Sequence, residues 1–392
     1  MFETAPLNPP DAIFGLMEEF KKDSNPDKIN LTVGVYRDEA GTTPVMKAVR
    51  QAEQILLDAA GSKGYLPIDG ATDYNAAVGK LILGESSSAQ IATAQTPGGT
   101  VSLRLAGELV KRVFSVDTIW MSNPTWANHP QIYTAAGLNL KKYEYLDDAG
   151  TGLGFEKVLS SLAEAKAGEA ILLHTVCHNP TGVDPTPDQW KELLTLVADK
   201  KLIPIFDFAY QGFGESLEAD AFPIRHFIEA GNDAIVCNSF SKNFGLYAER
   251  VGGISAIAQS SDVANAMRSQ IKSTIRTMYS NPPLHGGAIV QTVLTDAGLR
   301  STWETELAEI RNRILDLRGK FVDKMQSLAP DRDFGYIKQQ RGMFSYSGLR
   351  ADQVARLKAK HSIYALGSGR INIAGINSGN MDRLCEAIAS VL

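Results

Sequence analysis

The sequence predicts an α/β protein with one large and one smaller domain. Short runs of strand-forming residues recur through the middle of the chain, and helical stretches lie between them. Several runs are apolar without alternation, which is typical of strands buried on both faces of a sheet with a parallel core. The chain has 392 residues, more than one hydrophobic core usually organises, so two domains are expected.

The individual elements follow from local patterns. The expected strands lie at residues 118–122, 170–176, 202–208, 234–240 and 251–258. A helix is expected to begin after Thr186, which opens a capping box with Pro at the first helical position. Apolar residues recur at three- and four-residue spacing from Trp303 to Leu328, which predicts one long amphipathic helix. A helix over 351–361, a strand pair within 363–375 and a closing helix complete a smaller α+β domain.

Composition and charge exclude several classes of protein. With 44% hydrophobic and 21% charged residues, the chain is neither disordered nor fibrous. Its net charge of −5, without a block of Lys or Arg, argues against nucleic acid as a partner. No apolar run is long enough for a membrane helix. Three cysteines without metal-ligand spacing, and a first stretch without signal or transit features, predict a cytoplasmic protein with no metal site.

Polar motifs follow three of the expected strands. Asn179 lies in "HNPTG" after the strand 170–176, Asp207 ends the next strand, and Lys242 follows the strand 234–240. Each has a structural interpretation when taken alone, such as a turn or a buried ion pair. Because ligands bind outside the carboxyl ends of strands in open α/β sheets, the three together predict one site at this edge.

A further motif predicts an anion site. "TPGGT" at 96–100 precedes an amphipathic helical run, and a helix that begins after glycines offers free N–H groups to a phosphate. A lysine, a carboxylate, a tyrosine and a phosphate site together match the needs of pyridoxal phosphate. The lysine forms a Schiff base with the aldehyde, and a carboxylate keeps the pyridine nitrogen protonated so that the ring acts as an electron sink.

Seven motifs, in order along nearly the whole chain, carry a specific resemblance. They are "TPGGT", "NPTWANH", "CHNPTG", "DFAYQGF", "SFSKNFGLYAERVGG", "YSNPPLHG" and "SGRINIAG". The ordered set resembles the aspartate and aromatic aminotransferases of fold-type I. The resemblance implies a large domain at 44–305 with a mostly parallel seven-stranded sheet sandwiched by helices. It also implies an N-terminal arm and part of the small domain at 1–43, a small C-terminal domain at 306–392, and pyridoxal phosphate as cofactor.

The resemblance also implies roles for residues around the cofactor. Lys242 holds the cofactor and, once displaced by substrate, moves the proton between the substrate Cα and the cofactor. Asp207 pairs with the pyridine nitrogen, Tyr210 and Asn179 bind the ring oxygen, and Trp126 stacks on the ring. The residues implied for the phosphate are Gly99, Thr100, Ser239, Ser241 and Arg250, joined by Tyr65 of a second subunit.

Substrate recognition is implied in the same way. Arg370 is expected to bind the α-carboxylate in a bidentate pair, and Arg276 of the second subunit the distal carboxylate. Gly34 lies where the N-terminal segment of the family closes over the substrate. Trp126 and Asn179 are expected to contact the substrate as well. Two shared sites imply a homodimer that acts on small amino acids and 2-oxo acids.

The implied reaction transfers the amino group of L-aspartate to 2-oxoglutarate, giving oxaloacetate and L-glutamate, by a ping-pong mechanism through a pyridoxamine phosphate form. The alternative is an aromatic amino acid aminotransferase, because both groups share the residues named above. "KNFGLY", "YSNPPLHG" and "GVYRDEAGTTPV" resemble the aspartate group more closely, whereas Ala248 fits neither.

Three other functions fit the sequence less well. Ser239 to Lys242 matches the S-x-x-K motif of serine acyl-enzymes, but the S-D-N and K-T-G motifs that should accompany it are missing. A non-enzymatic regulator of this fold would be expected to lack Lys242 or Asp207, or to carry an added DNA-binding segment. A nucleotide-binding protein would need one of the two glycine-rich phosphate motifs, and neither occurs.

Overall fold

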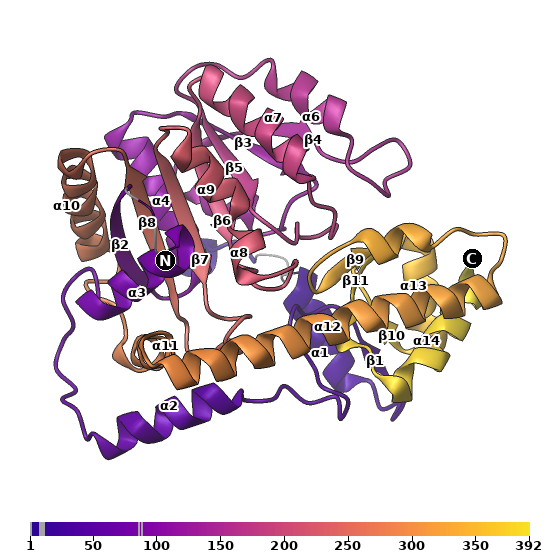
Figure 1. Cartoon of the computed structure of the whole chain (residues 1–392). Coiled ribbons are helices and arrows are strands. Elements are labelled where there is room, and N and C mark those ends of the chain that lie inside the picture. Colours follow the sequence, from indigo (N-terminus) through magenta and orange to yellow (C-terminus); the bar gives the residue numbers. More distant parts are fainter. Residues whose placement is uncertain (1, 8–11, 85–86, 88) are drawn as a thin grey trace. The chain divides into compact units, whose positions relative to one another are not determined.

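The computed structural model in Figure 1 describes residues 2–7, 12–84, 87 and 89–392. The chain divides into two compact units. The larger consists of Pro44–Arg313 and Gln340–Gly342, and the smaller combines the segment up to Thr43 with Ile314–Gln339 and Met343–Leu392. The functional domain boundaries expected at 43/44 and 305/306 stay a prediction.

A seven-stranded sheet forms the centre of the larger unit, as predicted. Its strand order is β2-β8-β7-β6-β5-β3-β4, and only β8 runs antiparallel to its neighbours. The strands are β2 (Gln90–Thr96), β3 (Thr118–Asn123), β4 (Asn139–Glu144), β5 (Ala170–His174), β6 (Ile203–Phe208), β7 (Ala234–Ser239) and β8 (Gly252–Ala258). Five of them lie where the sequence predicts a strand; β2 and β4 were not predicted.

Helices surround this sheet, and several of them pack directly against it (Figure 1). Those of the larger unit are α2 (Lys47–Asp58), α3 (Thr72–Leu83), α4 (Gly99–Val113), α5 (His129–Ala135), α6 (Phe155–Leu162), α7 (Pro187–Asp199), α8 (Leu217–Asp220), α9 (Phe222–Glu229), α10 (Ser261–Met278) and α11 (Leu284–Thr295). Helix α7 begins with the predicted capping box at Thr186. One apolar cluster joins α4, α5 and α10 to alternate residues of the strands, among them Leu172, Ile205 and Ile254.

The long helix α12 (Ala297–Leu328) starts six residues before its predicted beginning at Trp303, and from Ile314 onward it belongs to the smaller unit. The other elements of that unit are η1 (Phe2–Thr4), α1 (Ala12–Lys22), β1 (Ile29–Asn30), η2 (Gly335–Gln339), β9 (Phe344–Tyr346), α13 (Ala351–His361), β10 (Ile363–Tyr364), β11 (Arg370–Asn372), η3 (Ile373–Gly375) and α14 (Ser378–Val391).

The strand pair predicted within 363–375 is wrong in its pairing. Strands form at both places, but β10 pairs in parallel with β1, and β11 pairs in antiparallel with β9. The N-terminal segment therefore supplies one strand of the smaller unit. Within the described residues, no helix is long and apolar enough to cross a membrane.

Candidate active site

Strand direction and register bring the predicted motifs to one edge of the sheet. Thr96 at the end of β2 lies opposite Gly252, and Gly252 lies opposite Ser239 at the end of β7. On the other side of β7, His174 and Asp207 lie opposite each other at the ends of the parallel strands β5 and β6. The loops that carry Asn179, Tyr210 and Lys242 all leave the sheet at this edge.

The start of α4 forms a cradle for an anion. Gly98 precedes the helix with φ 84° and provides no side-chain cap. The N–H groups of Val101 and Ser102 donate to the Gly98 carbonyl, which leaves those of Gly99 and Thr100 for a ligand. A Cβ at Gly98 would lie 2.5 Å from the Arg250 guanidinium, and one at Gly99 would lie 3.0 Å from the Ser239 Cβ. Any residue larger than glycine at either position would therefore place its side chain in this cradle.

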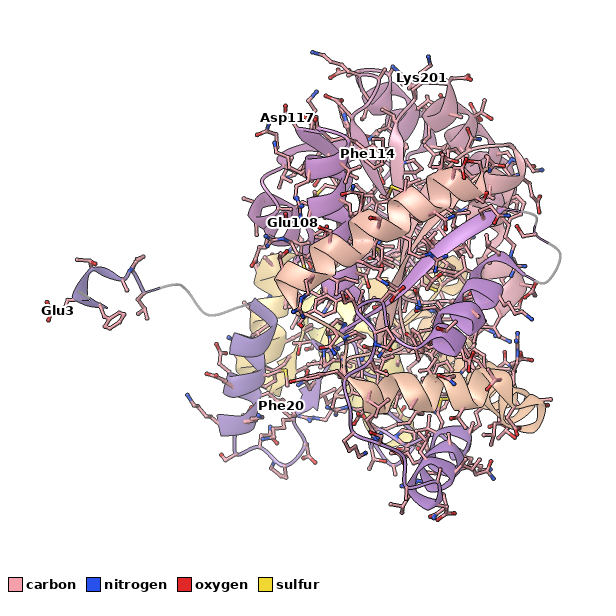
Figure 2. All side chains as sticks on the ribbon, turned by 90° about the vertical axis from the view of Figure 1, so that its left-hand side faces the viewer. Glu3, Phe20, Glu108, Phe114, Asp117 and Lys201 are labelled. Atoms are coloured by element: carbon pink, nitrogen blue, oxygen red, sulfur yellow. The ribbon has the colours of Figure 1, made fainter. Side chains whose placement is uncertain are left out.

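Hydroxyl and guanidinium groups complete the cradle. Arg250 donates from Nη1 to Ser241 Oγ at 3.3 Å, and the Ser241 backbone N–H donates to Ser239 Oγ at 3.3 Å. At the opposite end of α4, Lys111 and Arg112 complement the helix dipole, and Glu108, Phe114 and Asp117 mark that end in Figure 2. The Arg250 guanidinium and the N–H groups of the first turn therefore lie together at the beginning of α4.

Lys242 lies beside Tyr210, with its Nζ 5.1 Å from the centre of the phenol ring. Burial lowers the pKa of Lys242 below its usual value of 10.5, and the nearby charge of Arg250 lowers it further, against the opposing effect of Asp207. A lysine in these surroundings gives up its proton more readily than an exposed one.

Asp207 faces α5 because side chains alternate along a strand. It lies two residues after Ile205, which belongs to the core under α4 and α5, so both point to the same face. There its Oδ2 lies 3.0 Å from His129 Nε2. Burial alone would raise the pKa of Asp207, but the His129 hydrogen bond, with His129, His174 and Lys242 nearby, lowers it overall. The carboxylate therefore stays ionised.

A chain of hydrogen bonds that the sequence motifs do not predict lies behind Asp207. His129 Nδ1 lies 2.8 Å from Thr125 Oγ1, which in turn lies 2.9 Å from His174 Nε2. The ring of Trp126 meets the ring of His129 edge to face at 5.2 Å. His129 ends the quoted motif "NPTWANH", and His174 lies inside the predicted strand 170–176 but ends the observed strand β5. A search for polar residues near strand ends would therefore have found His174.

Buried histidine makes stability depend on pH. Burial lowers the pKa of His174 from 6.5 to about 3, so between these values the unfolded chain binds one proton more and the free energy of unfolding rises with pH. One proton corresponds to about 1.4 kcal/mol per pH unit. From pH 6 to pH 4, cofactor-free wild type should lose about 2 kcal/mol more than His174→Gln in urea titrations. Equal losses would show that His174 titrates normally.

Tyr65 and Arg276 lie together in a pocket of about 520 Å³ that includes none of the other predicted site residues. Tyr65 is 96% exposed, and Arg276 is exposed and donates to Ser280 Oγ at 2.6 Å.

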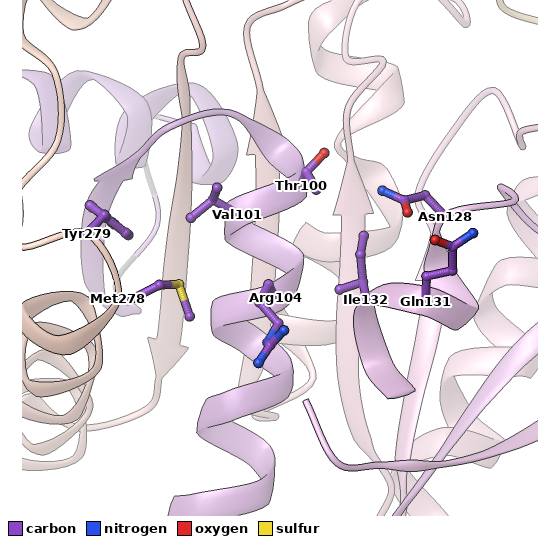
Figure 3. Close-up of a pocket in the computed structure, with 8 residues that line it drawn as sticks. All are labelled: Thr100, Val101, Arg104, Asn128, Gln131, Ile132, Met278 and Tyr279. Carbon is purple, nitrogen blue, oxygen red and sulfur yellow. The ribbon is translucent and has the colours of Figure 1, made fainter. Parts of the chain in front are cut away.

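A second pocket, of about 430 Å³, begins at Thr100 in the first turn of α4 and lies between α4, α5 and the end of α10 (Figure 3).

Arg370 and Gly34 both lie in the smaller unit, around Phe344. The Arg370 guanidinium lies 4.0 Å from the centre of the Phe344 ring and donates to the carbonyl of Thr32. A Cβ at Gly34 would lie 2.5 Å from Phe344 Cζ. The structure therefore joins these two predicted residues through one aromatic side chain.

Comparison with known proteins shows the family of the chain. The family model of class I and II aminotransferases matches residues 26–388. The chain belongs to this family. It is 48% identical to an aspartate aminotransferase of Haemophilus influenzae and 41% identical to an aromatic-amino-acid aminotransferase of Escherichia coli, with 100% of each chain covered in both cases.

A solved relative shows the same fold. It is an aromatic-amino-acid aminotransferase from Burkholderia pseudomallei, covalently bound to pyridoxal phosphate; its TM-score is 0.98 at 44% identity, and the match covers 100% of this chain and 99% of that one. The mostly parallel seven-stranded sheet and the assignment to fold-type I are therefore confirmed.

Proposed function

We propose that this aminotransferase uses pyridoxal phosphate to transfer the amino group of L-aspartate to 2-oxoglutarate, producing oxaloacetate and L-glutamate. The observation that carries the proposal is the meeting of Lys242, Asp207 and the cradle of α4 at one sheet edge. The full-length identity of 48% to an aspartate aminotransferase favours aspartate as the substrate.

The residues at this edge fit the cofactor. The cradle would collide with any Cβ at Gly98, and it offers N–H, hydroxyl and guanidinium donors, which is the donor set for a phosphate. Its residues in this proposal are Gly99, Thr100, Ser239, Ser241 and Arg250. The ionised Asp207 suits a protonated pyridine nitrogen, since it is an acceptor held in place by His129.

When bound, pyridoxal phosphate supplies an electron sink for negative charge at the substrate Cα. Lys242 anchors it covalently and moves the proton at Cα, a role that its lowered pKa favours. Tyr210 and Asn179 would hold the ring oxygen by hydrogen bonds, and Trp126 would cover the ring. Arg370 binds the substrate α-carboxylate, in the segment of the smaller unit that also holds Gly34.

Steady-state kinetics test the choice of substrate. The expected result is a kcat/KM for L-aspartate at least about tenfold above that for L-phenylalanine, with 2-oxoglutarate as acceptor. An aromatic amino acid aminotransferase is the second candidate, favoured by the similarity to the solved relative. Equal or higher values for phenylalanine would establish that candidate instead.

Arg276 is proposed to bind the distal carboxylate of the substrate. Arg276→Ala should lower kcat/KM for L-aspartate by about 100-fold or more, because one side of a charge-assisted pair is lost. The value for L-phenylalanine, which has no distal carboxylate, should change less than about threefold. Arg300→Ala, which removes a surface ion pair with Glu304, serves as control. Equal losses for both substrates would disprove this role.

Tyr65 and Arg276 are proposed to serve the site of a second subunit in a homodimer. Their exposure and their separate pocket support this role. Mixed dimers of Lys242→Ala and Arg276→Ala subunits should then regain about a quarter of wild-type activity, because half of the dimers hold one intact site of two. No recovery would contradict shared sites. The three buried cysteines, none of which forms a disulfide within the described residues, fit the proposed cytoplasmic location.

A further inference from the structure

Two carboxylates near the candidate site have no part in the proposed chemistry. Asp184 lies ten residues after the end of β5 and is partly buried. Asp220 ends α8 and is only 4% exposed. Carboxylates are rarely buried unless they accept hydrogen bonds that their surroundings need. Their partners therefore indicate what each one does.

Asp184 closes the loop that carries Asn179. Its Oδ2 accepts from the backbone N–H of Cys177 at 2.7 Å, and its Oδ1 accepts from that of His178 at 2.8 Å. Cys177 has φ 55°, a left-handed conformation that residues other than glycine rarely adopt without support. Both N–H groups immediately precede Asn179, so the carboxylate fixes the direction in which the chain enters that residue.

Asp220 closes the loop that follows Tyr210 in the same manner. Its Oδ2 accepts from the N–H groups of Gly212 at 2.8 Å and Gly214 at 3.0 Å, and its Oδ1 accepts from Glu215 at 2.9 Å. Gly212 has φ 92° and no room for a Cβ, which would lie 2.4 Å from a Leu307 methyl group.

The two loops pack against each other. A Cβ at Gly214 would lie 2.5 Å from Asp220 Oδ1 and 2.6 Å from a methyl group of Val176, which precedes the first loop. Burial, mainly, raises the pKa of Asp184 to about 6, and the neighbouring charge of Asp220 raises it too. The backbone hydrogen bonds from Cys177 and His178 and the charge of Arg341 oppose this rise in the pKa of Asp184, so the loop that the carboxylate closes also stabilises its charge.

We propose that Asp184 and Asp220 are a pair of positioning residues, each holding by its backbone hydrogen bonds the loop that presents one ligand of the cofactor ring oxygen, Asn179 or Tyr210. The proposal rests on the proposed function. Hydrogen bonds from these two groups to the ring oxygen lower the basicity of the nitrogen that links Lys242 to the cofactor. Loosening either loop therefore raises the pKa of that linkage.

Asp184→Asn is the sharpest test, because it keeps the shape of the side chain but turns one acceptor into a donor that faces an N–H group. In absorbance titrations of the holoenzyme, the linkage pKa should rise by about one unit relative to wild type. Asp220→Asn should shift it in the same direction. Asp147→Asn is the matched control, since that carboxylate accepts from the Thr151 N–H in a loop elsewhere on the larger unit, and its linkage pKa should equal that of wild type.

Amide hydrogen exchange provides a second readout that needs no cofactor. Asp184→Asn should accelerate exchange within 177–184, and Asp220→Asn within 210–216. Unchanged exchange would overturn the proposal, whether or not the wild type binds pyridoxal phosphate. A wild type that binds no pyridoxal phosphate would refute the proposed function, which is a separate result. Faster exchange with an unchanged linkage pKa would reduce both residues to structural roles. If Asp184→Asn does not fold, Asp184→Glu, which displaces both acceptors by one methylene, provides the same measurements.

Discussion

Lys242→Ala is expected to abolish covalent attachment of the cofactor and to lower kcat with L-aspartate by at least about 10⁴-fold. The variant removes the amine that anchors the cofactor and also the base that moves the proton at the substrate Cα. Burial lowers the pKa of Lys242, and the charges of Asp207 and Arg250 act on it as well. Borohydride reduction followed by peptide mass measurement checks the attachment, and steady-state kinetics checks the rate.

Controls separate this effect from misfolding. Lys191→Ala removes a surface lysine whose side chain is 51% exposed, and it should keep wild-type activity and attachment. Lys242→Arg keeps the positive charge but cannot form the linkage, so it should be as inactive as the alanine variant. A cofactor found on a different lysine, or activity within tenfold of wild type in Lys242→Ala, would contradict the assignment.

The second large effect is expected at Asp207. Asp207→Asn keeps the size of the side chain but removes the charge that pairs with the pyridine nitrogen, so kcat should fall on the order of 10³-fold. The buried His129 Nε2, which lies 3.0 Å from Asp207 Oδ2, can keep its hydrogen bond in this variant if the amide oxygen faces it, so the substitution removes the charge and not the contact. Stopped-flow absorbance of the reaction with L-aspartate measures the loss for this half of the cycle.

Asp148→Asn is the control for charge alone, since that side chain is 98% exposed and should leave the rate unchanged. If Asp207→Asn stayed within tenfold of wild type, a neutral partner at the pyridine nitrogen would be sufficient, and the proposed role of the carboxylate would be wrong.

The fold could be predicted where strands are apolar on both faces. Strands β5 and β7 are fully buried along their length, and each begins with four apolar residues in a row, at 170–173 and 234–237, which is the pattern typical of a strand buried on both faces. Strand β4 lies at the sheet edge and carries Lys141 and Lys142, which hide it from a search for apolar runs although charged edges are common. Strand β2 is rich in Ala, Gln and Thr, residues whose burial is decided by packing rather than by pattern.

The pairing in the smaller unit could not be predicted from local signals. β1 has two residues, Ile29 and Asn30, and it finds its partner β10 more than 300 residues later in the chain. Such short strands carry no periodicity. Only tertiary packing decides which segments pair.

In the candidate site, too, some residues could be predicted from the sequence and others could not. Lys242, Asp207 and Asn179 could be placed together because parallel strands end at one edge. The contacts of His129 and Asp184 could not be predicted, because these residues act through another side chain or through backbone groups. No residue pattern in the sequence indicates such contacts. The roles of Tyr65 and Arg276 come from resemblance alone, since residues that serve a second subunit have no signature within one chain.

The most direct test of the central claim is the absorbance spectrum of the purified protein, recorded before and after L-aspartate is added, with L-phenylalanine added to a separate sample. The proposed function predicts a band of lysine-linked pyridoxal phosphate that converts to the amine form of the cofactor at a much lower concentration of aspartate than of phenylalanine. A protein that shows no such band, even after pyridoxal phosphate is supplied, would contradict the assignment of Lys242 and the proposed reaction together.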